Sequence, residues 1–265
     1  MRTGGDFTPR RDYDWPMNYR TALVTGASSG LGRGLATWLA RRGVLVYAAA
    51  RRTTMLEALQ REVGPSIIPL TLDVADADAT HARVTALDAE SGGLDLVVAN
   101  AGVGERRATG ADDWSHTLQL LKVNVLGAVA TLSAATPGMA SRKRGHLVGI
   151  SSLASLLPLP RSANYCASKA FLDMWLDATR LDVARRGVSV TSIQPGFVKT
   201  ELTQGHAPSE LPFVLEADDA VERIGQAIAR RDAVYAFPWQ MATLARAARV
   251  LPRGTRAWAV RQVRK

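Results

Sequence analysis

The sequence predicts an α/β protein with a single doubly wound, Rossmann-type parallel sheet and helices on both of its faces. Apolar runs of strand length alternate with longer helical patterns along most of the chain, which is typical of a parallel sheet. The first run, residues 21–25, leads directly into the glycine-rich segment 25–32 and then into a helical pattern. Right-handed crossovers between successive strands then give the doubly wound arrangement.

Each apolar run is assigned to a strand, and each segment with helical spacing to a helix. The predicted strands are residues 21–25, 44–49, 67–72, 94–100, 146–151, 188–194 and 233–237. The predicted helices between them are residues 31–42, 54–62, 76–90, 112–137, 164–186 and 218–230. The run 44–49 is apolar throughout, as expected for a strand that is covered on both faces.

Length and composition favour one domain, because 265 residues with 47% hydrophobic content can bury a large single core. We expect residues 1–18 to form an N-terminal extension and residues 19–238 to form the single α/β domain. Residues 239–265 are expected to form a basic helical tail, either part of the same domain or a lid. The segment 203–215 lacks periodicity and is interpreted as a functional loop.

Charge is concentrated at the C-terminus. The formal net charge is +9, and residues 233–265 contain no acidic residue. We interpret this tail as a lid or a solvated helical end, with peripheral membrane contact as the alternative. No base-reading motif accompanies it, so no nucleic acid is expected.

The other bulk features point to an intracellular protein. Cys166 is the single cysteine, so no intramolecular disulfide can form. No apolar stretch follows the basic N-terminal residues, and the longest apolar run is too short to span a bilayer. A cytoplasmic location is predicted.

The glycine-rich loop has the spacing of a phosphate cradle. Gly26 allows a tight turn after the first strand, and Gly30 allows the backbone to approach a pyrophosphate. Gly32 allows the next helix to pack closely on the sheet, while the amino end of that helix attracts the phosphates. The segment therefore predicts a dinucleotide site.

Tyr165 and Lys169 are four residues apart, which places them on one face of a helix. A nearby ammonium stabilises a phenolate, so we expect Lys169 to lower the pKa of Tyr165 from its ordinary value near 10. A tyrosine with a lowered pKa can act as a general acid and, once deprotonated, as a general base. Ser152, thirteen residues upstream of Tyr165, can donate a hydrogen bond to an oxygen on which negative charge develops.

The order of segment 25–32, Asn100-Ala101-Gly102, Ser152 and Tyr165-x-x-x-Lys169 resembles the short-chain dehydrogenase/reductase family. The resemblance covers about residues 19–237. It implies a nicotinamide-dependent oxidoreductase acting on a carbonyl or an alcohol, and seven strands in the order 3-2-1-4-5-6-7. It also implies a homodimer or homotetramer built on the two longest helices.

The family interval selects Ser152 rather than Ser151. It also adds Asn124, which in the family kinks the long helix and holds a water in the proton relay to the lysine. The catalytic residues implied by the resemblance are Asn124, Ser152, Tyr165 and Lys169.

Cofactor choice is predicted from the end of the second strand. By alignment with the family, Ala50 stands where NAD-dependent members carry an aspartate. Arg51 and Arg52 follow, and a guanidinium can pair with a 2′-phosphate in forked geometry. NADP(H) is therefore expected in preference to NAD(H). The residues expected to bind the cofactor are Gly26, Ser28, Ser29, Gly30, Leu31, Gly32, Arg51, Arg52, Asp73, Val74, Asn100, Ala101, Gly102, Tyr165, Lys169, Pro195, Gly196, Val198 and Thr200.

Segment 153–160 is almost wholly apolar and is expected to line one wall of the substrate pocket, with Leu153, Leu159 and Phe197 named as pocket residues. A hydrophobic carbonyl or alcohol substrate is therefore predicted. Fatty-acyl, steroid-like, polyketide and xenobiotic ketones all remain open. The four histidines lack metal-ligand spacing, so no metal site is predicted.

Two other functions remain as alternatives. The chain could be a noncatalytic NADP-sensing regulator on the same fold, although such proteins usually lose the tyrosine or the lysine. It could also be a membrane-associated adaptor that works through its basic tail, which would leave the catalytic residues unexplained.

Overall fold

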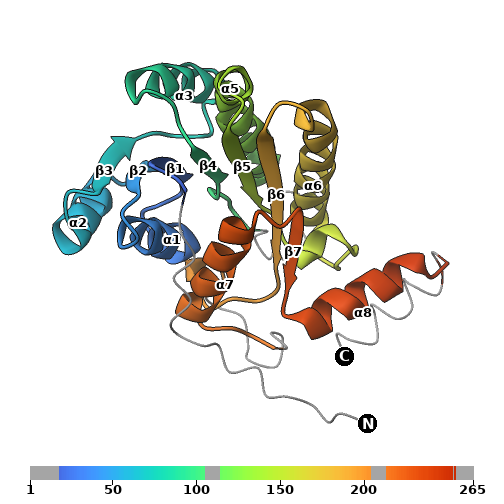
Figure 1. Ribbon diagram of the computed structural model, residues 1–265. Helices are drawn as coiled ribbons and strands as arrows, with labels where there is room; N and C mark the ends of the chain where they lie inside the picture. The colour runs from blue at the N-terminus through green and yellow to red at the C-terminus, as the bar shows by residue number, and fades with distance from the viewer. Residues whose placement is uncertain (1–17, 105–113, 204–212, 253, 255–265) are drawn as a thin grey trace, which may run out of the picture.

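A central sheet lies between two layers of helices in the computed structural model, which describes residues 18–104, 114–203, 213–252 and 254 (Figure 1). Among these residues, seven strands form one parallel sheet in the order β3-β2-β1-β4-β5-β6-β7. The strands are β1 (Thr21–Thr25), β2 (Leu45–Ala50), β3 (Ile67–Thr71), β4 (Leu96–Ala99), β5 (Gly145–Ile150), β6 (Val188–Pro195) and β7 (Val234–Phe237). The predicted fold class and strand order are confirmed.

The helices connect the strands and cover both faces of the sheet. They are α1 (Gly30–Ala40), α2 (Thr53–Val63), α3 (Ala77–Glu90), α4 (Trp114–Leu121), α5 (Ala128–Ser141), α6 (Ala163–Val183), α7 (Ala217–Arg230) and α8 (Trp239–Val250). Three short turns complete the set: the π-helix η1 (Lys122–Gly127) and the 3₁₀ helices η2 (Leu153–Ser155) and η3 (Glu201–Thr203). In Figure 1, α1 and α7 lie on one side of the sheet, and α3, α5 and α6 lie on the other.

Strand β1 shows why the strands are apolar on both sides. Ala22 and Val24 pack into the core shared with α1, α2 and α7. Leu23, between them, packs into the core shared with α3, α5 and α6. Because successive side chains of a strand point to opposite faces, a strand covered on both faces needs an apolar residue at each position.

The long helix predicted over residues 112–137 is corrected. Residues 112 and 113 lie outside the described part of the chain, and the rest divides into α4, the π-helix η1 and α5. The helix also continues through Pro137 to Ser141. Met139, beyond the proline, is fully buried in the core, and this packing favours continuation of the helix. Elsewhere the predicted ends lie within a few residues of the observed ones.

Within the described residues, Trp114–Ser141 is the one helical stretch long and apolar enough to cross a membrane, with a mean hydropathy of 1.4. More than half of that apolar window is buried inside the protein. Its central residues pack between α3 and α6, so its hydropathy is accounted for by its place in the core.

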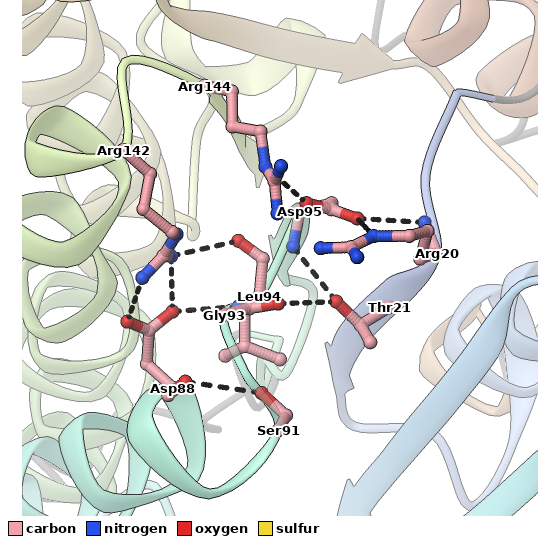
Figure 2. Close-up of polar contacts among 9 residues, drawn as sticks. All are labelled: Arg20, Thr21, Asp88, Ser91, Gly93, Leu94, Asp95, Arg142 and Arg144. Carbon is pink, nitrogen blue, oxygen red and sulfur yellow. Dashed lines mark hydrogen bonds and ion pairs between the residues drawn. The ribbon is translucent and has the colours of Figure 1, made fainter.

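Ion pairs join the elements at the amino-terminal edge of the sheet (Figure 2). Asp88, near the end of α3, accepts two hydrogen bonds of 2.7 Å from Arg142. Asp95, just before β4, pairs with Arg144 at 3.2 Å and accepts the backbone N–H of Arg20 at 2.9 Å. These contacts tie together the starts of β1, β4 and β5, on the edge opposite the carboxyl ends of the strands.

Helix α8 lies at the start of the predicted helical tail, residues 239–265. It buries Ala242 and Ala245 and leaves Trp239, Leu244 and Val250 exposed. Residues 1–17, 204–212, 253 and 255–265 lie outside the described part of the chain, so the N-terminal extension, most of the loop 203–215 and the end of the basic tail stay predictions.

Candidate active site

A cleft of about 430 Å³ lies at the carboxyl ends of the strands. The segments that follow β1 to β6 line it, around the point between β1 and β4 where the strand order reverses. Ligands of open α/β sheets bind at this switch point. All nineteen residues predicted to bind the cofactor line the cleft, which places them together, while their binding role stays a prediction.

The glycine loop between β1 and α1 is closely packed against Asn100. A Cβ on Gly32 would lie 2.3 Å from the carbonyl oxygen of Gly26 and 2.4 Å from Asn100 Nδ2. Asn100 Nδ2 in turn donates to the carbonyl oxygen of Thr25 at 2.8 Å. Gly26 also has a φ of +69°, which favours glycine. The loop is therefore held in a fixed position at the floor of the cleft.

The amino end of α1 faces the cleft without a side-chain cap. Ser29 is the N-cap residue, yet its side chain forms no capping hydrogen bond, and no acidic residue lies in the first turn. The first N–H groups of a helix have no partner inside the helix, and they carry partial positive charge. This end of α1 is therefore suited to a phosphate group.

The two arginines after β2 differ in their surroundings. Arg51 is exposed. Arg52 lies over the glycine loop and donates to the hydroxyl oxygens of Ser28, at 3.0 and 3.1 Å, and of Ser29, at 2.7 Å. Arg52 also pairs with Glu201 at 3.4 Å. Of the two arginines, Arg52 is thus the one held beside the phosphate loop.

Asp73 and Val74, which follow Leu72 just beyond the end of β3, line another part of the cleft. Asp73 Oδ1 accepts the backbone N–H of Ala75 at 3.0 Å. Val74 is buried, and a Cβ on Gly127 would lie 2.4 Å from its carbonyl oxygen. The π-helix thus packs directly against Val74, one of the residues predicted to bind the cofactor.

Asn124 lies within the π-helix and is almost fully buried. Its Oδ1 accepts the backbone N–H of Val103 at 2.8 Å, and its Nδ2 donates to the carbonyl oxygen of Val103 at 2.9 Å. A Cβ on Gly102 would lie 3.4 Å from Asn124 Oδ1 and 3.6 Å from Lys169 Nζ. The structure therefore brings Asn124 and Lys169 to the same side of Gly102.

Ser152, Tyr165 and Lys169 converge in the cleft. Tyr165 and Lys169 lie one turn apart on α6, and Lys169 Nζ is 5.7 Å from the centre of the Tyr165 ring. Ser152 lies just after β5 and shares a hydrogen bond with the Tyr165 phenol. Ser151 instead donates to the carbonyl oxygen of Lys169 at 3.2 Å, away from the phenol.

The expected lowering of the Tyr165 pKa is wrong for the protein without a bound cofactor. Burial raises the pKa of the Tyr165 phenol above its ordinary value, and the hydrogen bond with Ser152 offsets this only in part. The ammonium of Lys169 donates to the carbonyl oxygen of Ile150 at 2.8 Å rather than to the phenol. Desolvation thus sets the direction of the pKa shift, and residue spacing alone does not reveal it.

Burial also lowers the pKa of Lys169 to about 8, although the carboxylate of Asp173 opposes this shift. Asp173 lies one turn beyond Lys169 on α6. It accepts hydrogen bonds from Ser192 at 2.6 Å and from Gln194 at 2.8 Å. A lysine that titrates near neutral pH is suited to proton exchange.

The predicted substrate-pocket residues lie outside the lining of this cleft. Leu153 is buried, and its Cδ1 lies 3.4 Å from the position of a Cβ on Gly196. Leu159 and Phe197 are half-buried. Their substrate role stays a prediction.

Sequence reasoning missed several residues near the site. Glu201 and Thr203 line the cleft, and Asp173 supports the charge of Lys169. The position of Asp173, four residues after Lys169, could have indicated it, because residues at that spacing share a helix face. Glu201 has no comparable signal, since its partner Arg52 is 149 positions away.

A family model described as short chain dehydrogenase matches residues 20–210. Among curated proteins, an uncharacterized oxidoreductase of Myxococcus xanthus is 56% identical over 239 residues, which cover 89% of this chain and 94% of that protein. Both matches extend over most of the chain.

Solved structures agree with the fold. A short-chain dehydrogenase from Sphingobium yanoikuyae in complex with NADPH has a TM-score of 0.75 at 26% identity, covering 86% of this chain and 93% of that chain. A short chain dehydrogenase from Burkholderia cenocepacia in complex with NADP has a TM-score of 0.77 at 25% identity, covering 89% and 95%.

Proposed function

This chain belongs to the short-chain dehydrogenase family, and on that premise we propose that it is an NADP(H)-dependent oxidoreductase. It transfers a hydride between the nicotinamide and the carbonyl or secondary alcohol of a hydrophobic substrate. Tyr165 is the general acid and base of this reaction.

One observation carries the proposal: Ser152, Tyr165 and Lys169 share a cleft with the uncapped amino end of α1. A site for phosphates and a site for proton transfer are therefore continuous. A noncatalytic sensor would need the first but not the second, so the arrangement favours an enzyme.

The residues present fit a nicotinamide dinucleotide. The N–H groups at the start of α1 would hold its pyrophosphate, and Arg52 would hold a 2′-phosphate. Ala50 leaves the end of β2 without the carboxylate that would repel such a phosphate. When bound, the cofactor supplies or accepts the hydride.

The chain's own residues manage the substrate oxygen and its proton. The hydroxyl of Ser152 donates a hydrogen bond to the oxygen, where negative charge develops during reduction. Tyr165 delivers the proton in reduction and removes it in oxidation. Lys169, held near Asn124 and Gly102, replaces that proton.

The relatives support cofactor binding, since two solved structures of similar fold contain NADPH or NADP. The apolar residues of segment 153–160 support a hydrophobic substrate.

The test is turnover with NADPH and with NADH against a panel of hydrophobic ketones. We expect NADPH to be preferred by roughly ten- to a hundredfold in kcat/KM, the value of one charge-assisted contact. Ala50→Asp combined with Arg52→Ala should reverse the preference. Ala50→Asp combined with Arg51→Ala is the matched control. It should shift the kcat/KM preference toward NADH by a smaller factor. Equal or better turnover with NADH by the unmodified protein would contradict the cofactor assignment.

A further inference from the structure

Three side chains from distant parts of the chain meet at the mouth of the cleft. Arg52 follows β2, Ser29 precedes α1, and Glu201 begins η3. Ser29 Oγ donates to Glu201 Oε2 at 2.9 Å, and Arg52 Nη2 approaches the same oxygen at 3.4 Å. Arg52 Nη2 also donates to Ser29 Oγ at 2.7 Å. We call this group of three residues the Arg52 clasp.

The clasp engages the groups that the proposed function assigns to phosphates. Ser29 lies in the phosphate loop but is turned toward Glu201 rather than capping α1. Arg52 is the guanidinium beside that loop. A carboxylate oxygen and a phosphate oxygen accept hydrogen bonds from the same donors, and both carry negative charge. Glu201 therefore occupies the hydrogen-bonding position of an anionic group of the cofactor.

Charge makes the two occupants mutually exclusive. A 2′-phosphate bound to Arg52 would carry up to two negative charges. The phosphate and the Glu201 carboxylate would then be bound to the same guanidinium, and their like charges would repel each other. Among the described residues that line the cleft, Glu201 and Asp73 are the acidic ones, and Asp73 instead accepts a hydrogen bond from its own turn. Glu201 is thus the acid that a 2′-phosphate must displace.

Resting on the proposed function, we infer that Glu201 is a specificity-determining residue that competes with the cofactor 2′-phosphate for Arg52. Binding of NADP(H) opens the clasp, whereas NAD(H) has no phosphate with which to displace the carboxylate. Glu201 thus weakens the binding of NADPH more than that of NADH. Both partners are about half exposed, at 49% for Arg52 and 54% for Glu201, so the carboxylate can move away into solvent.

The test compares binding of NADPH and NADH to Glu201→Gln and to the unmodified protein, measured by nicotinamide fluorescence. Glutamine keeps the size of the side chain and removes its charge. We expect the Kd for NADPH to fall roughly three- to tenfold and that for NADH to change by less than about twofold. The gain should shrink in high salt, because exposed charges are screened.

Glu216→Gln is the matched control. Glu216 is an exposed acid that pairs with Lys199, next to Thr200, and it forms no recorded contact with Arg52. This variant should leave the ratio of the two Kd values unchanged. Thermal melting of both variants checks that they fold.

The outcomes separate this inference from the proposed function. The role of Glu201 would be overturned if Glu201→Gln bound NADPH no more tightly than the unmodified protein does. It would also be overturned if the affinities for NADPH and NADH rose equally. Either result would leave the proposed NADP preference unaffected. An unmodified protein that binds NADH but not NADPH would contradict the proposed preference. In that case, the clasp would be supported if Glu201→Gln created NADPH binding and overturned if it did not.

Discussion

The side-chain amide of Asn124 pairs with both backbone polar groups of Val103, accepting from its N–H at 2.8 Å and donating to its carbonyl oxygen at 2.9 Å. This pairing joins the π-helix to the segment after β4, across the floor of the cleft. It accounts for the irregular helix at this point, because the amide must face Val103 to form both bonds.

The Asn124–Val103 pairing gives the first prediction. Asn124→Ala removes both bonds, together with the hydrogen bond from Asn124 Nδ2 to Ser168 Oγ at 3.2 Å, in a buried region and should destabilise the protein by about 2 kcal/mol or more. Asn124→Asp keeps an acceptor for the Val103 N–H but buries a carboxylate against the Val103 carbonyl oxygen, so it should destabilise the protein at least as much. Urea unfolding of the three proteins measures this. Equal unfolding midpoints for Asn124→Ala and the unmodified protein would show that the pairing does not contribute.

Packing around Gly32 gives the second prediction. Gly32→Ala would place its Cβ 2.3 Å from a backbone oxygen, so the phosphate loop must shift, and NADPH binding should weaken by about tenfold or more. Gly34→Ala on the same helix is the control, since its Cβ would meet the side chain of Val221 on α7 instead of the backbone of the glycine loop. Isothermal titration with NADPH compares the two variants. Similar affinities would contradict a close-packed loop.

Buried His146 gives a prediction on pH. His146 Nδ1 lies 2.7 Å from Tyr19 Oη, and His146 Nε2 lies 2.8 Å from Thr191 Oγ1. The Thr191 hydroxyl donates its own proton to the carbonyl oxygen of Asp232, so we infer that Nε2 carries a proton and donates it to Thr191 Oγ1. Burial lowers the pKa of His146 from 6.5 to about 3. Between those values the unfolded chain binds a proton that the folded protein does not, so stability falls as pH falls.

The expected slope from His146 is at most about 1.4 kcal/mol per pH unit below pH 6.5. His146→Asn should make the pH dependence shallower over this range, while His81→Asn, which alters an exposed histidine, should leave it unchanged. Urea unfolding at several pH values between neutral and about 4.5 gives the comparison. Parallel pH profiles for all three proteins would contradict a neutral buried imidazole.

Exposed apolar side chains give the prediction on assembly. Large apolar residues are exposed on α4, on η1 and along α6: Trp114, Leu118, Leu126, Phe171, Met174 and Leu181. Such a surface favours association. We expect light scattering to report a dimer or tetramer, and Phe171→Glu with Met174→Glu to shift it toward the 28.5 kDa monomer. Leu244→Glu on α8 is the control. A monomer of unmodified protein at micromolar concentration would refute the assembly.

Much of the fold could be predicted because its signals are local. Alternating elements fix a parallel sheet, and the segments after its strands must then meet at one edge. That is why the glycine loop could be assigned to this edge from its position and its residue types, whereas Asn100 and Thr200 were added by the resemblance to the family.

The features that could not be predicted depend on burial and on contacts between residues far apart in the sequence. The π-helix is associated with the pairing of Asn124 and Val103, a contact between elements. The partner of Arg52 could not be predicted, because Glu201 reaches it only after the chain has folded. The direction of the Tyr165 pKa was missed because desolvation depends on the whole surroundings of the phenol.

The central claim is that Tyr165 transfers the proton during hydride transfer, and single-turnover oxidation of bound NADPH by a confirmed ketone substrate tests it most directly. Tyr165→Phe removes the hydroxyl and keeps the ring. We predict that this variant binds NADPH within about twofold of the unmodified protein and transfers hydride about a hundredfold more slowly or worse. A Tyr165→Phe variant that oxidises NADPH at a near-normal rate would contradict the account.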